Sequence, residues 1–226
     1  MSSQKLAVYS IKIGGDITWF SIITNLLARS SRSERCIINE QSNSYIGGYF
    51  LLETVHNQME YNIEDNCFEM IPVKRLGIMK FDVFTSNQTL LLWGGSRVSS
   101  AFLTAVERAG EHNITLDYKK SDFKKMVEYL IKNPLVTFVR MRIKDVLIDQ
   151  GIIANCSVNL KGQENANGLV KKYLNNISQI SVLIGSNHSP VSLSIYSSGS
   201  VVVYKDRDDI PEEAMSAISE MLGGVM

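Results

Sequence analysis

The residues best suited to chemistry in this sequence lie in one short segment, 138–144. Side chains there alternate between two kinds, which predicts a β-strand with two different faces. One face would carry Phe138, Arg140, Arg142 and Lys144. The other would carry Val139, Met141 and Ile143.

The first of these faces combines cations with an aromatic ring. An arginine guanidinium holds a phosphate through two parallel N–H groups, and a phenyl ring offers a plane on which a base can stack. The face therefore predicts a contact with nucleic acid, either DNA or RNA. The alternative is an ordinary solvated sheet face, on which arginine and lysine serve solubility.

A lysine cluster surrounds the start of the helix expected before this strand. It consists of Lys119, Lys120, Lys124 and Lys125. Lys120 and Lys124 are candidates to extend the basic face. A solvated helix face explains the same residues without any ligand.

A further candidate is an anion site at Gly94-Gly95-Ser96-Arg97, between an apolar strand and a helix start. Free backbone N–H groups and the helix dipole favour an anion at such a place. The glycine spacing matches neither the phosphate-binding loop nor the dinucleotide-binding fingerprint. A glycine turn followed by a serine cap is the alternative.

Groups suited to catalysis or metal binding are scattered. The histidines and cysteines are His56, His112, His188, Cys36, Cys67 and Cys156. The histidines are isolated in the sequence, and the cysteines form no C-x-x-C pair. We therefore expect a non-catalytic protein without a cofactor or a metal ion, although residues distant in sequence can converge in a fold.

Length and composition set the broad class. The chain has 226 residues, 45% of them hydrophobic, which suffices for one or two domains with buried cores. It carries 23 Lys and Arg against 23 Asp and Glu, with a pI of about 6.8. The chain therefore lacks the overall positive charge typical of nucleic-acid-binding proteins, and any such binding must come from a local patch.

The sequence favours the cytoplasm. Three widely spaced cysteines do not indicate a disulfide framework. The longest apolar stretch near the N-terminus, residues 17–28, is short and interrupted by Thr, Ser and Asn. It predicts neither a spanning helix nor a signal peptide, so we expect no membrane insertion.

Periodicity predicts the elements of the first half. Strands are expected at 5–13, 45–54, 76–85 and 89–93, and helices from the Asp16 cap to Arg29 and from Arg97 to Ala109. Residues 30–35 are expected to form a loop. The polar stretch 56–70 is expected to separate two strands, and Ser86-Asn87-Gln88 to form a hairpin turn.

The second half has a similar pattern. Ser121 is expected to cap a helix that ends at Asn133-Pro134, and Asp209 to cap a helix that runs to Gly223. Strands are expected at 135–148, 152–160, 178–185, 191–197 and 200–205, with a helix near 165–176.

These elements predict an α+β fold of two halves, 1–110 and 111–226, each an antiparallel sheet with helices. An internal duplication would explain why residues 83–93 and 195–204 both contain a turn, an apolar run and a final aromatic. Each segment then leads into a helix that ends at glycine. The alternative is convergence, because hairpin-plus-helix units are common.

The order of elements resembles that of the RexA-type phage-exclusion proteins over residues 5–160. The likeness lies in a strand (Leu6–Ile13), an apolar helix (Trp19–Leu27), a hairpin and helix (Phe81–Ala109), a Lys-rich helix start (Lys119–Lys125) and the basic strand (Phe138–Lys144). It implies a two-lobed α+β sensor that binds DNA and acts through a separate effector. It transfers no individual functional residue.

The sequence thus favours a non-catalytic cytoplasmic binding module, in phage defence or regulation, that contacts nucleic acid through the basic strand face. The alternative is a protein-interaction or oligomerisation subunit of a larger complex, with a homo-oligomer or another protein as partner. The zero net charge, the 9 Met residues and the apolar runs at 90–93 and 201–204 indicate that alternative.

Overall fold

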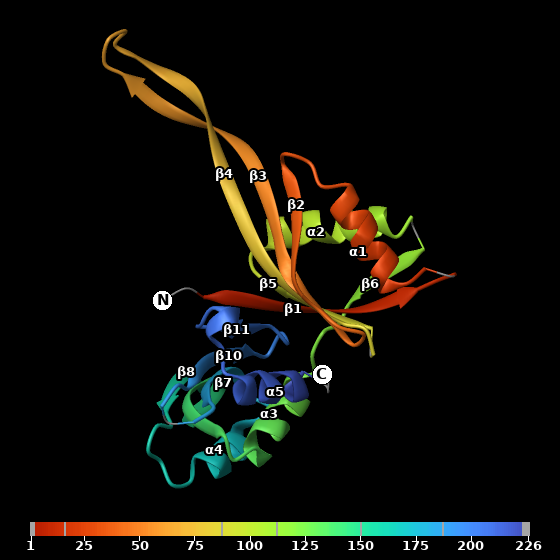
Figure 1. Cartoon of the computed structure of the whole chain (residues 1–226). Helices are drawn as coiled ribbons and strands as arrows, with labels where there is room; N and C mark the ends of the chain where they lie inside the picture. Colours follow the sequence, from red (N-terminus) through yellow and green to blue (C-terminus); the bar gives the residue numbers. More distant parts are fainter. Residues whose placement is uncertain are drawn as a thin grey trace. The chain divides into compact units, whose positions relative to one another are not determined.

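The structure is a computed structural model that describes residues 3–15, 17–86, 88–111, 113–149, 151–186 and 188–222. These residues form eleven strands and five α-helices, which confirms the α+β class, with strand predominating (Figure 1). The elements of the first half are β1 (Gln4–Ile13), α1 (Trp19–Ala28), β2 (Glu34–Gln41), β3 (Tyr45–Asn62), β4 (Cys67–Phe84), β5 (Thr89–Trp93) and α2 (Ser96–Ala109). Those that follow are β6 (Ile114–Tyr118), α3 (Phe123–Lys132), β7 (Val136–Asp149), β8 (Ile152–Asn159), α4 (Ala166–Tyr173), β9 (Ile177–Ile184), β10 (Val191–Tyr196), β11 (Val201–Val203), a 3₁₀ turn (Arg207–Asp209) and α5 (Glu212–Met221).

The chain forms two compact units. The N-terminal unit is Ser10–Asp117, and the C-terminal unit combines Met1–Tyr9 with Tyr118–Met226. Strand β1 contributes to both, because its first residues pair with β11 while the Ile11 N–H donates to the Gln88 carbonyl at 2.8 Å. The halves expected from the sequence, 1–110 and 111–226, stay a prediction. The internal duplication stays a prediction.

The N-terminal unit contains strands in the order β2-β3-β4-β5-β1. Its core face is aromatic. The Phe102 ring of α2 stacks on Phe81 with ring centroids 4.6 Å apart and packs against Phe50 at 5.2 Å. All three side chains are buried, so α2 is held to the strands by a contact of the kind that contributes most to core stability.

Strands β3 and β4 form one long hairpin that extends past the helices of its unit (Figure 1). Its pairing runs without interruption from Tyr45 opposite Phe84 to Asn62 opposite Cys67. The expected break over 56–70 is therefore wrong. Most polar residues of this stretch occupy alternate positions, so they form one face of a strand and do not indicate a loop.

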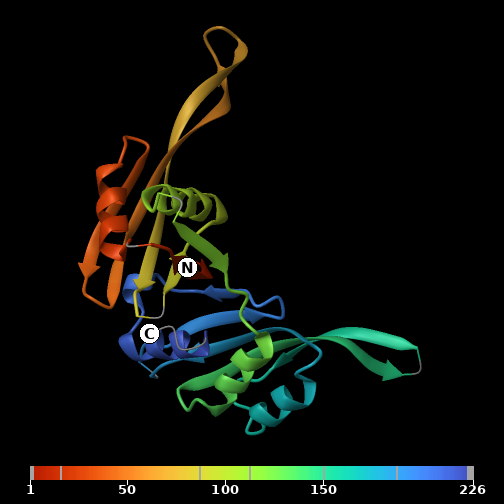
Figure 2. The same ribbon diagram turned by 90° about the vertical axis from the view of Figure 1, so that its right-hand side faces the viewer.

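The C-terminal unit contains strands in the order β1-β11-β10-β9-β7-β8. Helices α3, α4 and α5 lie on one face of this sheet (Figure 2). Buried side chains from every second strand position, including Val182, Leu193 and Val203, line that face. Among the described residues, no helix of this unit lies over the opposite face, whose exposed residues are the candidates for function.

Helix starts differ from the sequence-based expectation at two caps. Asp122, not Ser121, caps α3, and its carboxylate accepts from the backbone N–H groups of Lys124 and Lys125. Asp209 lies in the 3₁₀ turn, so the expected capping box does not form and Pro211 occupies the N-cap of α5. Asp16 and Gly223 lie outside the described residues, and Thr18 caps α1.

Two strands are absent from the sequence-based expectation. The segment expected to begin as a loop becomes β2 at Glu34, and β6 lies in a stretch without an assigned element. Both are short or mostly polar, so their alternation gives only a faint signal.

Candidate nucleic-acid interface

A bulge in β7 separates the expected aromatic residue from the basic face. Phe138 lies opposite Val182 of β9, while Arg140 lies opposite Ser181, so Val139 is an extra residue in β7. Because the side-chain period of a strand is two, one extra residue turns the following positions to the other face. Phe138 is buried with the core, and its expected place beside the arginines is wrong.

The three cations of the expected site lie together on the face opposite the helices. Arg140, Arg142 and Lys144 are all exposed, whereas the intervening Met141 and Ile143 are buried. Within the described residues, none of the three cationic side chains has an ion pair or a hydrogen bond. Asp145 is the only acidic residue between 136 and 147. We call these three strand cations, Arg140, Arg142 and Lys144, the basic row.

Hydrogen-bonding side chains surround the basic row on both neighbouring strands. Arg140 is flanked by Asn159 of β8 and Ser181 of β9, and Arg142 by Ser157 and Gln179. On the next strand, the Ser194 hydroxyl lies 3.0 Å from the Ser181 hydroxyl and accepts from Gln179 Nε2 at 3.2 Å. These hydroxyl and amide groups contact each other across strands. Ser194 itself is buried and Gln179 and Ser181 are half-buried, so Ser157 and Asn159 are the exposed polar residues beside the cations.

Two tyrosines supply the aromatic component of this face. Burial raises the pKa of Tyr196, the neighbouring Tyr204 phenol raises it further, and the Arg142 cation lowers it by a smaller amount. Tyr204 also donates from its hydroxyl to Ser194 at 3.4 Å. Sequence reasoning missed both rings, although each follows a buried strand residue, Ile195 or Val203, and alternation therefore directs it to the exposed face.

The expected extension through Lys120 and Lys124 forms a separate groove. Both residues are exposed and, with the end of β10, line a cavity of about 450 Å³ at the start of α3. Gly199 makes this approach possible. It has φ of +85°, and a Cβ there would lie 2.4 Å from the Ser121 carbonyl oxygen.

The Gly94–Arg97 segment forms a helix start. Gly95 caps α2 without a side-chain hydrogen bond, and its carbonyl accepts from the Ser99 N–H at 3.1 Å. The Arg97 guanidinium lies 2.9 Å from Nε2 of His56 on β3. Arg97 is therefore engaged by β3, and the backbone N–H groups of the loop are those of an ordinary helix N-terminus.

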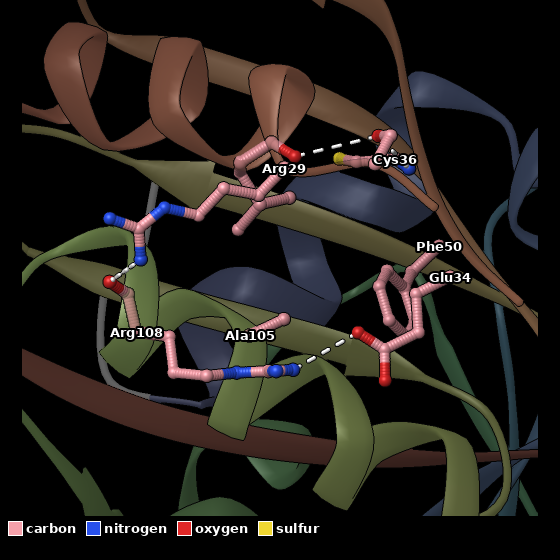
Figure 3. A pocket seen from close by; sticks show the side chains of 8 residues that line it. Arg29, Glu34, Cys36, Phe50, Ala105 and Arg108 are labelled. Carbon is pink, nitrogen blue, oxygen red and sulfur yellow. Dashed lines mark hydrogen bonds and ion pairs between the residues drawn. The ribbon is translucent and has the colours of Figure 1, made fainter. Parts of the chain in front are cut away.

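A small cavity of about 140 Å³ lies between α1, β2, β3 and α2 (Figure 3). At its rim, the Arg29 guanidinium donates to the Arg108 carbonyl at 2.5 Å, and Arg108 pairs with Glu34 at 3.0 Å. Burial raises the pKa of the Cys36 thiol to about 12, so the sulfur stays protonated at neutral pH. Arg29 and Arg108 are thus occupied by contacts within the protein, and the Cys36 thiol is not an activated nucleophile.

The described residues contain no group of three or more His, Cys, Asp and Glu placed to hold a metal ion. Cys67 is exposed and Cys156 half-buried, while His112 lies outside the described ranges. Within those ranges, every helix is too short or too polar to cross a membrane.

Comparison with known proteins finds only distant likeness, and that among solved structures. No protein-family model matches the chain, and no curated protein matches it. Among solved structures, Methanococcus jannaschii TBP is 8% identical, and the alignment covers 100% of this chain and 98% of that one. Its TM-score of 0.25 is too low for the match to support a conclusion.

Proposed function

We propose that the C-terminal unit binds nucleic acid through the basic row, Arg140, Arg142 and Lys144. The observation that carries this proposal is three exposed cations without an ion pair among the described residues, on a sheet face that no helix of the unit covers. Successive side chains on one strand face are about 7 Å apart at two residues of rise. That spacing is close to the separation of successive phosphates along an extended single strand.

The surroundings of the basic row fit a polyanion better than a small ion. Hydroxyl and amide groups of Ser157, Gln179 and Ser181 can donate to phosphate or sugar oxygens beside each arginine. Phe138 was expected to stack on a base, and the rings of Tyr196 and Tyr204 can do so instead, since bases stack on tyrosine as they do on phenylalanine. Such contacts favour backbone binding with little sequence preference.

The test is fluorescence anisotropy with labelled single- and double-stranded DNA and RNA, titrated from about 50 to 300 mM salt. Each phosphate contact contributes about one unit to the slope of log affinity against log salt. The variant Arg140→Gln/Arg142→Gln/Lys144→Gln should therefore lower the slope by about 3 and weaken binding roughly 100-fold at low salt, at ~1 kcal/mol per contact.

A matched control removes the same charge from the helical side of the same unit. Lys125, Lys132 and Lys171 are exposed on α3 and α4, and their triple change to Gln should leave the salt slope within about one unit of wild type. Equal losses in both triple variants would mean that net charge, not the basic row, drives binding, and the proposal would fail.

We further propose the setting that the sequence favours, a non-catalytic component of the cytoplasm with a role in phage defence. This part rests on the element order of residues 5–160 and on the scattered histidines and cysteines. Phage plating on cells that carry the wild-type chain or the basic-row variant tests it. The proposal predicts protection by the wild type alone, and equal plating on both strains contradicts it.

A further inference from the structure

The outer part of the β3–β4 hairpin has two faces of opposite character. Residues directly opposite each other in the register share a face. Leu76 (opposite Glu53), Val55 (opposite Lys74), the pair Met59 and Met70, and the pair Tyr61 and Phe68 therefore lie on one face. The other face carries Thr54 and Arg75, His56 and Val73, Gln58 and Ile71, and Glu60 and Glu69.

The first of these faces is an apolar stripe exposed along its length. It consists of Val55, Met59, Tyr61, Phe68, Met70, Leu76 and Ile78. Each is at least 50% exposed, and Phe68 reaches 69%. The Tyr61 and Phe68 rings contact each other with centroids 5.1 Å apart, yet neither is covered from above. Single exposed hydrophobic residues are ordinary, but a contiguous set of this size marks an interaction surface.

An uncovered two-stranded ribbon is also weak on its own. Two strands in water are marginally stable, and a third layer or a packed face is normally needed. On the stripe face, an ion pair between Lys74 and Glu53 joins the two strands at 2.9 Å, and exposed ion pairs contribute little. The hairpin therefore gains most from a partner that covers the stripe.

We propose that the occupant of the apolar stripe is the same stripe of a second copy of this chain, packed face to face and antiparallel. This arrangement places Tyr61 and Phe68 of one copy over Ile78 of the other, and the two methionines over Leu76. Each apolar end of one stripe then meets an apolar end of the other, while Asn57 and the ion pair of Glu53 with Lys74 share the same face between them. The contact is isologous, so it closes at a dimer and does not propagate.

The exposed area matches what such a dimer needs. An aromatic side chain alone carries roughly 150–250 Å², and seven large residues that are half or more exposed approach the ~800 Å² per partner of a standard interface. Two sheets packed in this way lie ~10 Å apart, which leaves room for both sets of side chains.

Charge argues against a nucleic acid or an anionic lipid at this surface. The outer hairpin carries Glu60, Glu64, Asp65 and Glu69, and no Lys or Arg occurs between residues 57 and 73. Phosphate would be repelled there. In the antiparallel dimer, Glu60 and Glu69 lie on the face turned away from the partner, so the carboxylates of both copies stay in water.

The test compares two lysine substitutions at adjacent positions, measured by light scattering and sedimentation on nuclease-treated protein in 0.5 M salt. Met59→Lys places a charge in the stripe, while Gln58→Lys places the same charge on the polar face. We expect wild type and Gln58→Lys to run at twice the 25.3 kDa chain mass, and Met59→Lys to dimerise roughly 30-fold more weakly.

Both substitutions lie outside the core, so circular dichroism should show wild-type folding for each. A wild-type monomer across micromolar concentrations overturns the proposal and points to a different protein as the occupant. Equal dimerisation of the two variants overturns it too. Because bound nucleic acid is removed first, this result does not depend on whether the C-terminal unit binds nucleic acid.

A distance between natural cysteines tests the antiparallel geometry. Cys67 lies on the exposed polar face near the turn, six residues beyond the centre of the stripe. At ~3.4 Å per residue, two spin labels on Cys67 of a Cys156→Ser variant should lie roughly 40 Å apart. A distance below about 20 Å means a parallel arrangement of the hairpins and contradicts the proposed one.

Discussion

In the described part of the chain, two strand faces have no helix of their own unit over them, and their chemistry is opposite. The face of β7 exposes Arg140, Arg142 and Lys144, whereas the outer face of β3–β4 exposes the apolar stripe. Both belong to antiparallel hairpins. The difference shows that an uncovered sheet face has no inherent role, since its side chains decide whether it attracts a polyanion or a hydrophobic surface.

Backbone regularity separates the two hairpins as well. The β3–β4 register is continuous over its full length, so alternate residues keep one apolar face. The β7 pairings contain register shifts next to Arg140, Arg142 and Val146, and Asp145 has φ of +56°. Bulges bend and twist a strand and redirect its side chains. The irregular hairpin thus turns Phe138 inward, and the regular hairpin leaves its aromatic residues outside.

The largest expected effect is the difference in stability between alanine substitutions of a buried and an exposed residue of β7. Phe138→Ala removes a buried ring and should lower the free energy of unfolding by about 3–5 kcal/mol in urea titrations. Arg140→Ala, two residues away and exposed, should change it by about 0.5 kcal/mol or less. Similar losses for both would mean that Phe138 is not a core residue and that the bulge is misplaced.

The corresponding change in the stripe should affect association and spare folding. Phe68→Ala removes an exposed ring from one end of the proposed dimer interface, so the dimer should weaken about tenfold. Its unfolding free energy, measured at concentrations where the chain is monomeric, should stay within about 0.5 kcal/mol of wild type. Sedimentation equilibrium and urea titration provide the two readouts, and a fold-destabilising Phe68→Ala would argue against an exposed stripe.

A smaller effect distinguishes charge from hydrogen-bond geometry in the basic row. Arg142→Lys keeps the cation and loses the planar pair of N–H donors. We expect the affinity for nucleic acid to fall about threefold while the salt slope stays constant, whereas Arg142→Gln should lower the slope by about 1. Anisotropy titrations at several salt concentrations measure both, and a changed slope for Arg142→Lys would contradict a phosphate contact at this residue.

The smallest effect concerns the thiols. Burial holds the pKa of Cys36 at about 12, above its ordinary value near 9, so the folded state keeps the proton that the unfolded state releases. Any stability gained from this is complete below pH 9 and is lost as the pH rises toward 12. At pH 8, iodoacetamide should modify exposed Cys67 and leave Cys36 intact, as mass spectrometry of digests would show.

Modification of Cys67 is also a mild probe of the hairpin. Because Cys67 lies on the polar face, its alkylation should leave both the dimer and nucleic-acid binding unchanged. Loss of the dimer after alkylation would place the polar face, and not the stripe, in the interface.

Periodicity was enough to predict most helices and the C-terminal strands, because their apolar residues follow one face continuously. Phe138 shows where it fails. A bulge leaves no mark in the alternation of a single strand, and only its partner β9 reveals the extra residue. Tyr196 and Tyr204 were missed for a related reason. The charge of Arg142 acts on Tyr196, and Tyr204 neighbours Tyr196, yet both tyrosines are more than 50 residues from Arg142 in sequence. The full length of the β3–β4 hairpin was not predicted, because polar residues at alternate positions made 56–70 resemble a loop.

Sedimentation velocity of the wild-type protein with a labelled oligonucleotide, at about 50 mM and 500 mM salt, tests the contrast between the two faces most directly. Electrostatic binding weakens steeply with salt, whereas apolar burial does not. We predict a dimer that carries the oligonucleotide at low salt and the same dimer without it at high salt. If high salt dissociates both the oligonucleotide and the dimer, or neither of them, the separate roles of the basic row and the apolar stripe are contradicted.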